Sequence, residues 1–410
     1  SGATLVESDR VIAMYHGTKA GNMVAVSSDP LLLNWQKVTG QPVIPMQRSD
    51  GSSWPFRIFD PCIWKKDGMY CALSGCTQLT GPAGKSMRAN MLFRSSDLVH
   101  WEYLHPFVEN DRYSRVGDDG ACPYFWPVGD RHVLLHFSHV SGGKYLVGDY
   151  DKERDKLDVR FGGDFNFGPV APGGVHAPSA TPDGRGGVIA IFNMNPGKPT
   201  RGWNQIMTLP RRLTLAPPDE PEALFAEPAG NLASLRQAHR STGPMTLPAN
   251  REVVLDNIAG TALELQARFE PDNVPVLEMN VLRSPDKAET TRIMFFRDRG
   301  CRHAEYAGDP ALRTKHDSLI SLDVSHASCL PDVKVRPPET APVFLKSDEP
   351  LDLRVFVDRS VVEVFVNGKQ CVAVRVYPGR EDSTGVSLLA RGHDARLASL
   401  DAWQMKSIYG

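Results

Sequence analysis

The chain has 410 residues, of which 41% are hydrophobic, and its formal net charge is −2. This length is too great for one ordinary hydrophobic core, so we expect two or three domains. The near-neutral charge excludes the basic surface that nucleic acid or an anionic membrane attracts, and no apolar run approaches the roughly 18 residues of a membrane span.

The seven cysteines are scattered and odd in number, which is not typical of a disulfide framework. His132, His136 and His139 could meet on a strand and its turn, but no matching Asp or Cys ligands accompany them. The sequence therefore predicts no metal site. The chain opens in an expected strand, so it does not distinguish a cytoplasmic from a secreted protein.

Short apolar runs separated by turn residues fill the first half of the chain. The 35 glycines and 32 prolines leave few windows that are long enough for helices. The expected strands are residues 11–15, 23–26, 70–74, 91–94, 133–137, 145–147 and 188–192. Short strands with turn signals between them predict an all-β sandwich or propeller.

A weak internal repeat favours the propeller. The triplet SSD at 27–29 follows one expected strand and precedes Trp35, and the same triplet at 95–97 follows another and precedes Trp101. A recurring strand-and-turn unit is typical of radially repeated blades. Surface turns are rich in Ser and Asp in any fold, so two copies with unequal spacing leave the alternative open.

The composition changes after Leu215. The acidic, proline-rich run APPDEPEALFAEPAG opens a segment, 216–245, that we expect to be a linker, with helical composition only around 220–238. Apolar alternation resumes from about residue 246. We therefore predict a propeller of catalytic type at 1–215 and a sandwich domain at 246–410.

The run LDLRVFVDRSVVEVFVNGKQCVAVRVYP at 351–378 gives the sandwich its strongest signal. Its apolar residues alternate with a period of two on both sides of Asn367-Gly368, which predicts an antiparallel hairpin joined at that turn. Glu363 is an isolated acid among valines in this hairpin, so we expect a structural or interface role for it.

The segment WPFRIFDP at 54–61 is the first candidate for chemistry. It places Trp54 and Phe56 beside Asp60. Aromatic faces can cover the C–H surfaces of a sugar while a carboxylate binds its hydroxyls. Asp before Pro is also an ordinary opening of a turn, and that reading stays open.

The segment DDGACPYFWP at 118–127 is the second candidate. Asp118 and Asp119 precede an aromatic run that includes Trp126, and one of them could be a carboxyl of raised pKa suited to a general acid. The alternative is a solvated turn before a buried strand. Cys122 is expected to be a small buried residue rather than a nucleophile, because no His lies nearby in the sequence.

A third group of residues could recognise hydroxyls. It consists of His176 in GGVHAPS, Asn193, and Trp203 in TRGW. Polar and aromatic side chains around short strands suit this role. His176 could equally be a capped histidine of a loop.

Taken together, these segments resemble glycoside hydrolase family 32. PTRGWNQIMTLPRRLTL at 199–215 is similar to the segment that closes the family's propeller, and VHAPSATPDGRG at 175–186 and LVHWEYL at 98–104 resemble two of its strand phrases. ASLRQAH at 233–239 and AWQMKSIY at 402–409 are similar to the first and last elements of its sandwich.

The resemblance spans nearly the whole chain. It implies a five-bladed β-propeller followed by a β-sandwich. It also implies action without a cofactor on β-fructofuranosides such as sucrose, inulin or levan, with retention of configuration by two carboxyl groups.

Two family motifs are altered in this sequence. Asp60-Pro61 matches the end of the Arg-Asp-Pro motif, so the resemblance implies that Asp60 binds fructose hydroxyls and stabilises the transition state. Phe59 stands at the Arg position, and Arg57 could reach the site only through a bulge. The Glu-Cys-Pro motif, whose Glu is the acid/base, reads Ala121-Cys122-Pro123.

An alanine cannot transfer a proton, so Asp119 and Asp118 are the nearby substitutes. Residues two apart on an extended strand share a face, which favours Asp119 as the partner of position 121. The predicted catalytic residues are therefore Asp60, Asp119 and Asp118.

The resemblance also implies a set of sugar contacts. His176 occupies the family's Tyr position, Asn193 lies near its Trp position, and Ser1-Gly2 matches the Ser-Gly-Ser that opens its second blade. The predicted substrate-binding residues are Ser1, Trp54, Phe56, Arg57, Cys122, Trp126, His176, Asn193 and Trp203.

The family's Asn-Asp-Pro-Asn-Gly motif, which carries the nucleophile, has no counterpart in the sequence. The first blade is therefore expected to be missing or incomplete, with an N-terminal segment or a further copy of the chain covering the open blade edge.

We expect a glycosidase for a β-fructofuranosyl disaccharide or oligosaccharide. A noncatalytic carbohydrate-binding protein on the same fold, and a glycosidase or fructosyltransferase for another furanoside, stay open as alternatives.

Overall fold

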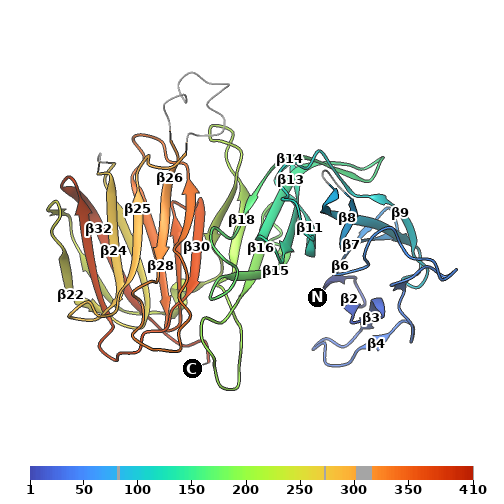
Figure 1. Ribbon diagram of the computed structural model, residues 1–410, viewed down its shortest axis with the longest axis horizontal. Coiled ribbons are helices and arrows are strands. Elements are labelled where there is room, and N and C mark those ends of the chain that lie inside the picture. Colours follow the sequence, from blue (N-terminus) through green and yellow to red (C-terminus); the bar gives the residue numbers. More distant parts are fainter. Residues whose placement is uncertain (81–83, 272–273, 302–315, 410) are drawn as a thin grey trace. The chain divides into compact units, whose positions relative to one another are not determined.

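The computed structural model describes residues 1–80, 84–271, 274–301 and 316–409. Within these ranges the regular structure is almost entirely β-strand, together with the short 3-10 helix η2 at Leu232–Leu235 (Figure 1). The prediction of an all-β protein is therefore confirmed. In the described part of the chain, no helix has the length and apolar character needed to span a bilayer.

The chain divides into two compact units, each of which is described by itself. The first unit comprises residues 1–164 and 177–190, and the second comprises residues 165–176 and 191–410. The first unit contains three sheets of short, mostly antiparallel strands. Each sheet is built largely from strands that follow one another in the sequence, as expected for propeller blades.

The first sheet has the order β1-β2-β3-β4, with β5 paired to β3. Its strands are β1 (Gly2–Val6), β2 (Val11–Gly17), β3 (Gly21–Ser27), β4 (Gln36–Lys37) and β5 (Ile44–Pro45). The second sheet, β6-β7-β8-β9, consists of β6 (Pro61–Lys66), β7 (Met69–Thr80), β8 (Ser86–Ser95) and β9 (Glu102–Pro106). The third sheet has the order β10-β14-β13-β12-β11. Its strands are β10 (Val108–Glu109), β11 (Ala121–Val128), β12 (Arg131–Ser138), β13 (Gly142–Asp151) and β14 (Lys156–Asp164).

The second sheet is buried on both of its faces. Ile63 of β6 packs into a cluster with Ile12 and Met14 of the first sheet. Cys62 and Trp64 alternate with Ile63 and pack into another cluster with side chains of the third sheet. This alternation follows from the period of two of a strand, and it gives β6 apolar residues on both sides.

A fourth sheet has the order β15-β16-β18-β19, with β17 paired to β16. Its strands are β15 (Val175–Pro182), β16 (Val188–Met194), β17 (Ile206–Met207), β18 (Arg211–Leu215) and β19 (Leu224–Pro228). The boundary between the two compact units falls within β15 and β16, so β18 and β19 belong to the second unit.

Two larger sheets make up the rest of the second unit. One has the order β20-β32-β23-β28-β29-β30, with β21 paired to β32, and the other has the order β22-β31-β24-β25-β26-β27. The strands of the first are β20 (Arg236–Thr242), β21 (Met245–Leu247), β23 (Ala262–Phe269), β28 (Leu351–Asp358), β29 (Val361–Val366), β30 (Gln370–Arg375) and β32 (Ala395–Met405). The strands of the second are β22 (Val253–Ala259), β24 (Val276–Arg283), β25 (Thr291–Phe296), β26 (Ser318–Asp323), β27 (Glu339–Val343) and β31 (Gly385–Arg391).

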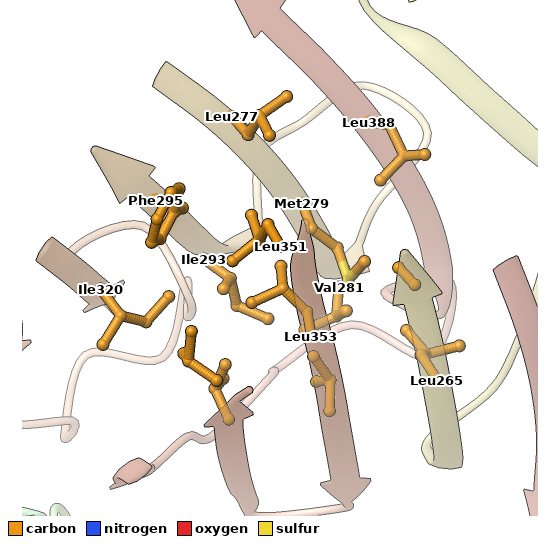
Figure 2. Close-up of a cluster of buried hydrophobic side chains, with 14 of the residues drawn as sticks. Leu265, Leu277, Met279, Val281, Ile293, Phe295, Ile320, Leu351, Leu353 and Leu388 are labelled. Carbon is orange, nitrogen blue, oxygen red and sulfur yellow. The ribbon is translucent and has the colours of Figure 1, made fainter. Parts of the chain in front are cut away.

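The two larger sheets enclose one hydrophobic core. Figure 2 shows Leu265, Leu351 and Leu353 from one sheet beside Met279, Ile293 and other apolar side chains from the opposite sheet. The predicted sandwich is therefore present.

The predicted linker, 216–245, contains β19, η2 and β20. β19 pairs with β18 in the fourth sheet, whereas β20 pairs with β32 of the sandwich. The division at residues 215 and 246 stays a prediction.

The hairpin at Asn367-Gly368 is present, but the run at 351–378 holds three strands rather than two. Asn367 and Gly368 have φ angles of 52° and 66°, as a tight type I′ turn requires. A further turn at Arg359, with φ 50°, separates β28 from β29. The run Asp358-Arg359-Ser360 marks this turn, but the alternation with a period of two continues in phase from Val357 to Val361.

Glu363 of β29 forms a buried ion pair with Arg211 of β18. Arg211 Nη2 donates to Glu363 Oε2 at 3.0 Å, and the Leu209 N–H donates to Oε1 at 2.6 Å. The two side chains are only 1% and 2% exposed. Burial raises the pKa of Glu363, while the contact with Arg211 opposes that shift. Glu363 therefore holds the fourth sheet to the sandwich, in agreement with the structural role expected for it.

Candidate active site

In the first unit, β6 of the second sheet lies next to both β1 of the first sheet and β11 of the third sheet. Ser1 immediately precedes β1, Asp60 immediately precedes β6, and Cys122 is the second residue of β11. Their side chains meet: Ser1 Oγ lies 3.3 Å from Cys122 Sγ, which lies 3.3 Å from Asp60 Oδ2. The structure thus brings together three predicted site residues that are far apart in the sequence.

Asp60 is held rigidly by this arrangement. The residue is 5% exposed, and the Cys122 backbone N–H donates to Oδ2 at 3.0 Å. Burial, aided by the nearby Asp60, raises the pKa of the Cys122 thiol to about 12, so the thiol keeps its proton near neutral pH and can donate it to Oδ2. In the described residues no hydrogen bond reaches Asp60 Oδ1. That oxygen is therefore available to a ligand hydroxyl.

The backbone before Asp60 is also fixed. Asn22 Nδ2 donates to the Phe59 carbonyl at 2.6 Å, and the Phe59 N–H donates to Ser74 Oγ at 3.0 Å. The Phe59 ring lies 5.2 Å from the ring of His16 and 6.5 Å from that of His139. Two histidines thus flank the residue that stands at the Arg position of the expected motif.

Arg57 lies two residues before the position of the missing arginine. Its side chain is exposed, and it forms no hydrogen bond or ion pair with any residue that the structure describes. The substrate contact predicted for Arg57 stays a prediction.

The turn that leads into β11 is not extended. Gly120 has φ +61° and Cys122 has φ +49°, and the pairing with β12 shifts register between Ala121 and Tyr124. A bulge of this kind breaks the alternation of faces. The argument that residues 119 and 121 share a face was therefore wrong, and Ala121 itself is completely buried.

A charged network supports this turn. Arg88 donates to Asn90 Oδ1 at 2.6 Å, to Ser114 Oγ at 2.9 Å and to Asp111 Oδ2 at 2.5 Å. Burial of Asp111 opposes its ionisation, but Arg88 holds the pKa of that carboxyl below its usual range. Asn90 Nδ2 in turn donates to the Gly120 carbonyl at 3.4 Å. The network fixes the segment that carries Asp119 and Cys122.

Replacing Gly120 by alanine is expected to destabilise the protein by about 2–4 kcal/mol, combining left-handed backbone strain with overpacking. An added Cβ would lie 2.6 Å from Arg88 Cγ. Gly184→Ala is the matched control, because Gly184 has φ +70° with nothing within 4 Å of its Cβ position. The free energy of unfolding of both variants is measured by urea denaturation. The loss in Gly184→Ala reports the backbone strain alone, and the additional loss in Gly120→Ala reports the clash with Arg88. Equal losses would show that Arg88 does not crowd the turn.

Asp118 is a structural carboxylate of the same turn. It is completely buried, and it accepts hydrogen bonds from the Arg115 N–H at 2.6 Å and from Ser141 Oγ at 2.5 Å. Lys144 Nζ lies 4.0 Å away. These contacts engage both of its oxygens, and the catalytic role of Asp118 stays a prediction.

Asp119 instead pairs with a histidine. Its Oδ2 lies 2.7 Å from His139 Nδ1, and the His139 backbone N–H donates to Oδ1 at 3.3 Å. The Asp119 side chain is 21% exposed and that of His139 is 57% exposed. His139 and His16 are thus two titratable side chains in ring contact with Phe59.

His132, His136 and His139 do not come together as a metal site. His136 is completely buried with neither ring nitrogen hydrogen-bonded, and burial lowers its pKa well below the ordinary value. His132 stacks on Phe125 at 5.1 Å. Among the residues that can be described, no group of three or more His, Cys, Asp or Glu side chains could hold a metal ion.

Comparison with known protein families decides the classification. Residues 1–228 match the description "Glycosyl hydrolases family 32 N-terminal domain", and residues 231–404 match "Glycosyl hydrolases family 32 C terminal". The chain belongs to glycosyl hydrolase family 32.

Relatives of this family-32 chain include a fructan 1-exohydrolase of Leymus chinensis, 25% identical over 92% of the chain and 69% of the relative. An insoluble β-fructofuranosidase isoenzyme 2 of Daucus carota is 23% identical over 99% of the chain and 76% of the relative. The crystal structure of fructan 1-exohydrolase IIa from Cichorium intybus has a TM-score of 0.82 at 18% identity, covering 99% of this chain and 83% of that chain. This likeness confirms the family-32 fold of propeller and sandwich.

Not all predicted aromatic contacts of the family-32 site lie near Asp60. Phe56 is 8% exposed and belongs to the core cluster between the first two sheets, where it stacks on Trp54 at 5.4 Å. The Trp54 indole N–H donates to the Pro45 carbonyl at 3.0 Å. Both residues therefore pack the core. Trp126 is half-buried, and its indole N–H donates to the Ala180 carbonyl at 3.2 Å.

The remaining predicted contacts belong to the second unit. His176 on β15 and Asn193 on β16 are half-buried. Trp203 is 47% exposed, and the Arg375 guanidinium lies 5.1 Å from the centre of its ring. Their role in sugar binding stays a prediction.

Sequence reasoning missed several residues of the family-32 site. His16 is the penultimate residue of β2, in the run MYHGT, where no nearby acid marks it. Asn22 and Arg88 likewise lie in ordinary strand patterns. Their roles arise from side-chain contacts with distant loop residues, so only the folded chain reveals them.

Proposed function

We propose that this family-32 protein hydrolyses β-fructofuranosides, with Asp60 stabilising the transition state. The fructosyl ring becomes positively charged as its bond to the leaving oxygen breaks, and a fixed carboxylate beside it stabilises that charge. The observation that carries the proposal is the immobilised Asp60, whose Oδ2 is occupied by Cys122 and whose Oδ1 faces no described partner.

Family membership supports the substrate class. Relatives are named fructan 1-exohydrolase, β-fructofuranosidase and sucrose-6-phosphate hydrolase, so fructosides are the shared substrate among them. The substrate proposed for this chain is a β-fructofuranosyl disaccharide or oligosaccharide. The retaining mechanism needs a carboxylate nucleophile, and the proposal assigns that role to none of the 410 residues. A homo-oligomer stays a prediction.

A second candidate function is noncatalytic carbohydrate binding on the same fold. The observation that favours it is Ala121, which stands where the resemblance places the acid/base and cannot transfer a proton. This candidate predicts saturable affinity for a fructoside without turnover.

Incubation with sucrose, inulin, levan and a panel of other furanosides tests these proposals. Released reducing sugar is measured together with binding by calorimetry. Turnover of a β-fructofuranoside is expected. Equal amounts of glucose and fructose from sucrose would indicate hydrolysis, whereas excess glucose would indicate fructosyl transfer. Binding of a sugar without any release would support the second candidate and contradict the first.

A further inference from the structure

A glycosidase that follows the proposed function needs a proton donor for the leaving oxygen. Position 121 cannot supply one, because Ala121 has no titratable group and is completely buried. Asp118 is enclosed by its own hydrogen bonds. The donor must therefore come from another element of the site.

The pair formed by Asp119 and His139 has the geometry of such a donor. Asp119 precedes β11 and His139 follows β12, and the antiparallel pairing of these strands brings the two together. Asp119 Oδ2 lies 2.7 Å from Nδ1, and Oδ1 accepts the His139 backbone N–H at 3.3 Å. The two contacts fix the imidazole and leave Nε2 at the far side of the ring from Asp119.

His139 borders the same site as Asp60. Its ring lies 6.5 Å from that of Phe59, the residue immediately before Asp60. Asp60 in turn binds Cys122, which lies three residues after Asp119. With 57% of its side chain exposed, the imidazole can be reached by a substrate.

His16 is the other histidine beside Phe59, but it suits the role less well. A general acid must carry its proton before the reaction begins. Burial lowers the pKa of His16, and the charge of Asp60 only partly opposes this. His16 is therefore neutral near neutral pH, and it has no carboxylate partner that orients its ring in the described residues.

We propose that His139, oriented by Asp119, is the general acid and base of this protein in place of the glutamate that family 32 uses. This inference rests on the proposed function. Asp119 is then a positioning residue rather than the proton donor that the sequence predicts.

The proton transfer balances as follows. The bond between the anomeric carbon and the leaving oxygen breaks, and its electron pair stays on that oxygen. The oxygen takes the Nε2 proton of the imidazolium and departs as an alcohol. A water molecule later bonds to the anomeric carbon and gives a proton to Nε2, which restores the imidazolium. The sum is glycoside plus water giving fructose plus alcohol.

The test compares two leaving groups in the full chain. His139→Gln and Asp119→Asn are assayed on the fructoside that the panel identifies and on β-fructofuranosyl fluoride, whose fluoride needs little protonation to leave. His139→Gln is expected to lose about 10²–10⁴-fold in kcat on the fructoside, the usual contribution of a general acid, and to keep most of its rate on the fluoride. Asp119→Asn should show the same selective loss to a smaller extent.

His100→Gln is the matched control. His100 Nδ1 lies 2.7 Å from Asp97 Oδ2 in an exposed turn before β9, so this variant breaks an equivalent pair away from the site. It should leave both rates unchanged.

Equal losses of His139→Gln on both substrates would give His139 a structural role and overturn the inference. Full activity of His139→Gln on the fructoside would also overturn the inference, but it would leave the proposed function intact. If the wild-type protein turned over the fluoride but not the fructoside, it would have no general acid, and the inference would be overturned. Failure of the wild type on both substrates would overturn the proposed function and this inference together.

Discussion

Asp60→Asn is expected to lower kcat/KM for a β-fructofuranoside by about 10²–10³-fold, the loss typical when one electrostatic stabiliser of a transition state is removed. Asparagine has nearly the shape of aspartate, and its amide oxygen can still accept the Cys122 N–H. The substitution removes the negative charge that the developing positive charge of the fructosyl ring requires.

Initial rates of sugar release, with thermal unfolding in parallel, measure this effect. Asp9→Asn is the control, because Asp9 is an exposed residue of the turn between β1 and β2. It should change neither rate nor stability. An Asp60→Asn variant that is folded and fully active would exclude Asp60 from the chemistry.

Glu363→Ala should destabilise the protein by about 3–5 kcal/mol, because it leaves the buried Arg211 guanidinium without its counter-charge. Arg211 lies 5.1 Å from the ring of Phe192 and 6.0 Å from that of Phe365, so aromatic faces offer it only weak compensation. The Leu209 N–H also loses its acceptor. Urea denaturation measures the loss.

Two controls sharpen this experiment. Asp352→Ala breaks the exposed pair of Arg268 and Asp352 on the same sheet, which should cost less than about 1 kcal/mol. The double variant Arg211→Met/Glu363→Leu replaces both charges by apolar groups and should recover most of the stability. A small loss for Glu363→Ala alone would contradict the structural importance of the pair.

The strands were predictable because their apolar residues alternate with a period of two over short runs. The same rule did not separate β28 from β29. The run Asp358-Arg359-Ser360 marks the turn between them. Val357 and Val361 on either side are an even number of residues apart, so the alternation continues in phase across the turn.

The candidate site was predictable only in part. The resemblance to the family's motifs located Asp60 and Cys122. Their contact across 62 residues follows from the packing of two neighbouring sheets rather than from local sequence. The reasoning about Asp119 assumed an extended backbone, which the positive φ of Gly120 excludes. His139 was considered only as a metal ligand, because no local pattern shows that Asp119 would meet it.

The ion pair between Arg211 and Glu363 also bears on the modular character of the chain. Although the family is described as an N-terminal and a C-terminal domain, the last blade strands and the sandwich form one compact unit. Separating the chain between residues 228 and 231 would leave the buried Arg211 guanidinium without Glu363 and would expose the apolar face around it. Recombination at that point would replace only one side of a common buried interface. The sandwich therefore cannot be exchanged independently of the last blade strands.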